Sequence, residues 1–140
     1  MRKSVLVLGL LATAAMVVYG QAAPVSYKTN LAGNSEVPPV NSQGKGSAQV
    51  TADSATNSVS WRVEFAGLSG PATAAHIHCG AAAGANAGVA VPLGNNPTSP
   101  ITGQGTMTPA QMQQLQGGQC YINVHTAANP GGEIRGQLAP

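Results

Sequence analysis

Residues 58–65 read Ser58–Val59–Ser60–Trp61–Arg62–Val63–Glu64–Phe65, the clearest structural signal in the 140-residue chain. The odd-numbered positions are apolar and the even-numbered positions are polar. This period of two is typical of a β-strand with one buried face and one solvated face. The segment Ala48–Gln49–Val50–Thr51 precedes it across the turn-rich residues 53–57. We therefore expect the two segments to form a β-hairpin.

Weaker strand signals recur along the rest of the chain, separated by connectors rich in glycine and proline. They cover residues 25–31, 74–79, 89–93, 101–106, 120–126 and 133–138. Seven or eight short strands with frequent turns favour an all-β, antiparallel sandwich of two sheets. We find no internal repeat and no linker that would divide the chain into two domains.

One short helix is predicted near residues 108–116. Thr108 suits the N-cap, Pro109 suits the first helical position, and Gln111 completes a capping box. Two glycines follow and end the segment. Met112 and Leu115 are three positions apart, so we expect them to form the buried side of this helix.

The N-terminus has the features of an export signal. Arg2 and Lys3 are followed by an uncharged apolar run, and small residues precede a predicted cut after Ala22. The apolar run is shorter than the roughly 20 residues that cross a bilayer, which favours cleavage over a retained membrane anchor. We therefore expect a signal peptide at 1–22 and one domain at 23–140, periplasmic or secreted and without a membrane anchor after cleavage.

Charge excludes one class of partner. After cleavage the chain is neutral, because its basic and acidic residues balance: Lys28, Lys45, Arg62 and Arg135 against Glu36, Asp53, Glu64 and Glu133. A neutral surface provides no long-range attraction for phosphates, so we expect no nucleic-acid partner. A metal ion or an extracytoplasmic protein remains a possible partner.

Cys79 and Cys120 are the two cysteines of the chain. In an exported protein such a pair predicts a disulfide, which would add about 4 kcal/mol to the stability in the chain-entropy model. The alternative interpretation is that one thiolate binds a metal ion.

The three histidines are the candidate ligands. His76 and His78 stand two apart on a predicted strand, so both rings share one face. His125 ends another predicted strand. The remaining polar residues expected around these rings are Tyr121, Asn123, Glu133 and Arg135. If the strands are neighbours in one sheet, the three imidazoles converge.

A cluster of three histidines with a nearby carboxylate is suited to Cu or Zn. The alternative is structural: the histidines bond to neighbouring polar groups, and Glu133 forms an ion pair with Arg135. The disulfide bears on this choice. A bridge between opposite sheets would separate His76 and His78 from His125, whereas a bridge between adjacent strands would keep them together.

The chain resembles the CHRD (chordin-type) domain family in three places. The opening motif is LAGNSEVPPV at 31–40, the central motif is TAAHIH at 73–78, and the closing motif is YINVHT at 121–126 followed by NPGGEIRGQL at 129–138. The resemblance implies an immunoglobulin-like β fold and a module without established catalytic activity. Cys79 departs from the family's usual pattern, which suggests an added disulfide or a copper ligand beside His78.

Three functions compete. The first is a non-enzymatic binding or structural module that holds a metal ion, and the second is a protein-interaction module without metal. The third is a copper enzyme similar to superoxide dismutase, which also has a His-x-His strand in a β-sandwich. Residues 81–119 contain no His, Asp or Glu, so the further ligands that such an enzyme needs are missing there.

Overall fold

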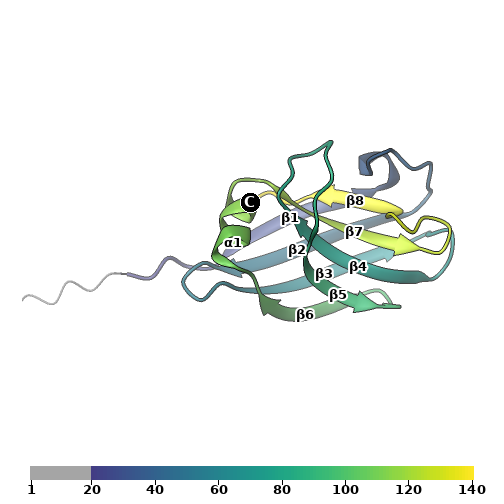
Figure 1. Ribbon diagram of the computed structural model, residues 1–140. Coiled ribbons are helices and arrows are strands. Elements are labelled where there is room, and N and C mark those ends of the chain that lie inside the picture. Colours follow the sequence, from purple (N-terminus) through teal and green to yellow (C-terminus); the bar gives the residue numbers. More distant parts are fainter. Residues whose placement is uncertain (1–19) are drawn as a thin grey trace, which may run out of the picture.

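The computed structural model describes residues 20–140, which contain eight β-strands and one α-helix (Figure 1). The number of strands and the position of the helix agree with the sequence prediction. The strands are β1 (Val25–Ala32), β2 (Lys45–Asp53), β3 (Ser58–Ala66), β4 (Ala72–Cys79), β5 (Val89–Asn95), β6 (Ile101–Thr106), β7 (Cys120–Thr126) and β8 (Ile134–Gln137). A 3-10 turn, η1 (Gly33–Ser35), follows β1, and α1 (Pro109–Gln116) precedes β7.

The hairpin predicted around residues 58–65 is confirmed. Strands β2 and β3 pair antiparallel along their whole length, with Val50 opposite Trp61 and Ala52 opposite Val59. Val59 and Val63 are buried, as the alternation predicts. The polar residues between them lie on the outer face, where an exposed ion pair joins Arg62 to Glu64.

All eight strands belong to one antiparallel sheet, in the order β5-β4-β7-β8-β1-β2-β3-β6. The sheet curves into a nearly closed barrel, and its two edge strands, β5 and β6, approach each other (Figure 1). The all-β antiparallel class is therefore confirmed. The expected two-sheet, immunoglobulin-like sandwich is not, because the two groups of strands are joined into a single sheet.

The join lies between β8 and β1. Only Ala32 and Arg135 pair within these two strands, and an isolated bridge between Lys28 and Ala139 extends the contact. Gly136 permits the close approach, because a Cβ there would collide with the carbonyl oxygen of Asn30. So short a contact leaves no periodic signal in the sequence.

The hydrophobic core fills the barrel. Large aliphatic side chains from opposite sides of the barrel are fully buried, among them Leu31, Val50, Ile77, Ile122 and Ile134. At the gap between the edge strands the Trp61 ring covers Gly103 and Gly105. Both glycines leave the space that the indole occupies.

Helix α1 lies at one end of the barrel (Figure 1). The predicted capping box is present: the Thr108 side chain accepts a hydrogen bond from the Gln111 backbone N–H, and the Gln111 side chain accepts one from the Thr108 backbone N–H. Met112 and Leu115 are buried, as predicted.

The predicted signal peptide, residues 1–22, lies almost wholly outside the described residues. Between residues 20 and 140, no helix has both the length and the apolar character needed to span a membrane.

Candidate metal centre

Neighbouring strands β4 and β7 carry the three histidines. They pair antiparallel, with His76 opposite Asn123, His78 opposite Tyr121 and Ala74 opposite His125. Because side chains alternate between faces, these polar residues lie on the outer face, and Ile77 and Ile122 lie opposite each other in the core. The same two strands thus build the core on one side and the candidate site on the other.

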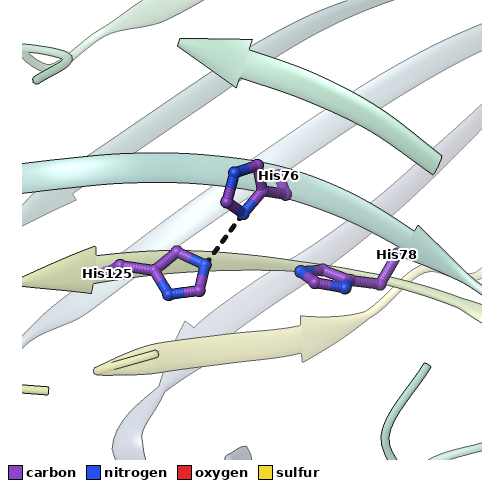
Figure 2. A group of neighbouring side chains, drawn as sticks. All are labelled: His76, His78 and His125. Carbon is purple, nitrogen blue, oxygen red and sulfur yellow. Dashed lines mark hydrogen bonds between the residues drawn. The ribbon is translucent and has the colours of Figure 1, made fainter. Parts of the chain in front are cut away.

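The three imidazoles converge (Figure 2). His76 Nδ1 lies 2.9 Å from His125 Nε2, and one ring nitrogen from each histidine lies within 4.8 Å of the other two. His78 and His125 are 8% and 9% exposed, whereas His76 is half-buried. Within residues 20–140 this is the one group of three His, Cys, Asp or Glu side chains with such spacing.

Backbone carbonyl groups orient two of the rings. His125 Nδ1 lies 2.9 Å from the Pro130 oxygen, and His78 Nδ1 lies 2.9 Å from the Ala87 oxygen. A carbonyl oxygen only accepts, so Nδ1 of a neutral His125 ring carries the proton and its Nε2 keeps a lone pair. In a neutral His78 ring the proton is on Nδ1 or on Nε2, because Nε2 also faces an acceptor, the Asn123 side-chain oxygen at 3.0 Å. Metal-binding histidines typically have this arrangement, in which the second ring nitrogen donates to a fixed oxygen.

The surroundings favour neutral rings. Burial lowers the pKa of His76, and the neighbouring His125 and His78 lower it further. Burial also lowers the pKa of His78, against the opposing effect of its hydrogen bonds to Ala87 and Asn123. Neutral imidazole is the form that binds metal ions. The lowered pKa values of His76 and His78 therefore favour metal binding near neutral pH.

Tyr121 and Arg135 support His78 from the side. The rings of His78 and Tyr121 are stacked, with centroids 4.7 Å apart and planes 4° from parallel. On the other face of Tyr121, the Arg135 guanidinium carbon lies 3.4 Å from the ring centroid. Arg135 also donates to the side chain of Asn86 and to the carbonyl oxygen of Ala85. The loop between β4 and β5 is thereby fixed over this part of the sheet.

Glu133 does not belong to the cluster, although the sequence placed it there. Its buried carboxylate instead accepts hydrogen bonds from the side chains of Ser42, Ser69, Thr126 and Asn129 and from the backbone N–H of Ser69. Burial alone would raise the pKa of Glu133, but these hydrogen bonds lower it to about 2. The alternative expectation of an ion pair with Arg135 is also wrong, because in residues 20–140 the only salt bridge joins Arg62 and Glu64.

Sequence reasoning missed a second acidic residue, Glu36. It follows η1, is 5% exposed, and lies next to Asn123 and Gly132. Burial raises the pKa of Glu36 to about 7, although the nearby Arg135 charge and Asn123 amide act in the opposite direction. The one feature of the sequence that could have indicated a buried acidic residue is the position of Glu36 directly before the apolar run 37–40.

Cys79 and Cys120 form a disulfide between directly paired positions of β4 and β7, with Cα atoms 4.1 Å apart. This is the arrangement between adjacent strands, which keeps the histidines on one surface. Both sulfurs are bonded to each other, so neither provides a thiolate ligand next to His78.

The donor set fits a small transition-metal ion. In a tetrahedral zinc site with Zn–N bonds of about 2.0 Å, the ligand nitrogens lie about 3.3 Å apart. The separations found here, from 2.9 Å up to 4.8 Å, bracket this value. Three neutral imidazoles suit Zn and Cu, whereas Mg and Ca prefer oxygen ligands.

Comparison with known proteins identifies the domain. No curated protein and no solved structure matches the chain. The CHRD domain model matches residues 27–138. This range includes all eight strands except the first two residues of β1, so both strands that carry the histidines lie within it. The chain therefore belongs to the CHRD domain family.

Proposed function

We propose that this protein is an exported, non-enzymatic CHRD-domain module that binds a transition metal ion, Cu or Zn, through His76, His78 and His125. One observation carries the proposal: three ring nitrogens converge, and the Nδ1 atoms of His78 and His125 are held by backbone oxygens. A hydrogen bond accounts for the approach of His76 to His125, but His78 brings a third ring nitrogen within 4.8 Å of both, so the cluster offers three nitrogen donors to one ion. A bound ion would link β4 to β7 on the face opposite the core.

Export is supported by the residues that precede the domain and by the disulfide. Disulfides persist in oxidising compartments, and Cys79 and Cys120 are bonded to each other. The pattern of a signal peptide at 1–22 agrees with this location. We therefore place the proposed metal site in the periplasm or outside the cell.

The test is calorimetric titration of the metal-free protein with Zn²⁺, Cu²⁺ and Cu⁺. We expect one ion per chain for wild type and loss of binding for His76→Ala and His125→Ala. Glu64→Gln, at an exposed position on β3, serves as the control and should bind like wild type. Equal, negligible heats for wild type and the histidine variants would remove the metal from the proposal and leave a protein-interaction module.

Chemistry of the superoxide dismutase type has no supporting observation, because no carboxylate joins the three histidines among residues 20–140. A superoxide assay on copper-loaded protein addresses it directly. We expect no activity above that of free copper, and clear activity would contradict the non-enzymatic part of the proposal.

A further inference from the structure

Asn123 occupies the centre of the histidine cluster. It pairs directly with His76, precedes His125 by two positions on the same face of β7, and contacts His78 diagonally across the strands. Only 2% of Asn123 is exposed. No other residue of the two strands adjoins all three histidines in this register.

The orientation of the Asn123 amide is fixed by its nitrogen. Nδ2 donates to the carbonyl oxygen of Gly131, at 3.4 Å. Oε1 of Glu36 lies on the same side, because a Cβ on Gly132 would collide with this oxygen and would come within 2.6 Å of Asn123 Nδ2. Because the Gly131 and Glu36 oxygens lie near Nδ2, the amide nitrogen points toward them and the amide oxygen Oδ1 points toward His78.

Two oxygens face the two nitrogens of the His78 ring, and a neutral ring has one proton for them. Oδ1 lies 3.0 Å from His78 Nε2, while His78 Nδ1 faces the Ala87 oxygen. A neutral imidazole carries one N–H, which cannot serve both oxygens. With the proton on Nδ1, the lone pairs of Nε2 and Oδ1 point at each other in a buried site, where an unsatisfied polar contact is costly. A cation placed between them and the other two rings would satisfy both atoms.

We propose that Asn123 Oδ1 is the fourth ligand of the metal site, which closes it as an N₃O set. This inference rests on the proposed function, since it concerns the ion held by the three histidines. Structural zinc sites have four protein ligands, whereas catalytic sites keep one position for water or substrate. The fourth ligand makes the ion a structural cross-link between β4 and β7.

Substitution of Co²⁺ tests the ligand set, because the visible spectrum of Co²⁺ reports coordination number and ligand exchange independently of affinity. The probes are Co²⁺ and, added afterwards, azide. For wild type we expect the intense bands of four-coordinate Co²⁺ and no change on addition of azide. Asn123→Ala should weaken Zn²⁺ binding by at least about 10-fold, the loss that even an outer-shell partner typically causes, and azide should then shift its Co²⁺ spectrum.

Two further variants separate a ligand from a neighbour. Asn123→Asp keeps an oxygen at the same place and should stay insensitive to azide, whereas Asn95→Ala, at an exposed position of β5, should match wild type in every measurement. An azide-dependent shift in wild type would overturn the proposal without any variant being needed. An unchanged spectrum and affinity in Asn123→Ala would overturn it as well. Absence of Co²⁺ and Zn²⁺ binding in wild type would instead refute the proposed function itself.

Discussion

His76 Nδ1 lies 2.9 Å from His125 Nε2, although the two residues are 49 positions apart in the sequence. The contact depends on the pairing of β4 with β7, and the two partners differ in their surroundings. His125 is almost fully buried and has a second hydrogen bond, to Pro130, whereas His76 is half-buried. Their roles in metal binding and in stability can therefore be separated.

The two histidine variants should differ when no metal is present. His125→Ala removes a ring that is 9% exposed, together with its hydrogen bond to the Pro130 oxygen, and should lower the free energy of unfolding by about 1–3 kcal/mol. His76→Ala should cost less than about 1 kcal/mol, because solvent reaches this position. Urea unfolding with a chelator present measures both values. Equal losses in the two variants would contradict this account.

Metal-free protein should lose stability in mild acid. The pKa values of His76 and His78 lie below 6.5 in the folded state, so the unfolded chain binds more protons as the pH falls past 6.5. The unfolding free energy should therefore rise with pH between about pH 5 and about pH 7. His76→Gln removes one of these groups and should flatten the curve. A variant curve parallel to that of wild type would show that His76 is not involved.

Glu36 should act in the opposite direction. Its pKa is about 7 in the folded state against 4.5 otherwise, so the folded state binds more protons between these values. Its contribution to stability is present below about pH 4.5 and is lost as the pH rises through about 7, by up to about 3 kcal/mol. Glu36→Gln should gain stability relative to wild type above pH 7, as measured by urea unfolding. The exposed Glu64→Gln provides the control and should show no such gain.

Glu133→Gln should destabilise the fold without affecting metal binding. The amide would place an N–H₂ group among hydroxyl and N–H donors, at a cost of roughly 3 kcal/mol. The pKa of about 2 lies below the ordinary 4.5, so the wild-type contribution is present above about pH 4.5 and is lost as the pH falls toward about 2. Thermal unfolding and zinc titration on the same sample measure the two effects. A fall in zinc affinity would place Glu133 near the ion after all.

Local patterns in the sequence were enough to predict the strands and the helix. The alternation in residues 58–65 and the capping box at Thr108 each depend on neighbouring residues only. The single sheet was not predictable in this way. It depends on the short contact of β8 with β1, where Ala32 and Arg135 form the one register pair within the strands.

The position of the histidines followed from alternation once β4 and β7 were assumed to be neighbours. The direction in which the Glu133 side chain points could not be predicted from alternation. Glu133 precedes β8, so the alternation of that strand does not extend to it. The partners of the imidazoles are the carbonyl oxygens of Ala87 and Pro130. Backbone atoms of loops leave no signal in residue types, so sequence patterns do not reveal them.

The disulfide has a consequence for how the two strands align. If β4 slipped by one residue against β7, His76 and His78 would enter the barrel and Ile77 would face solvent. Cys79 and Cys120 are directly opposed only in the observed register. Oxidation of these thiols therefore adds a covalent constraint to the alignment in which the imidazoles meet, the same alignment that the buried face of Ile77 and Ile122 favours.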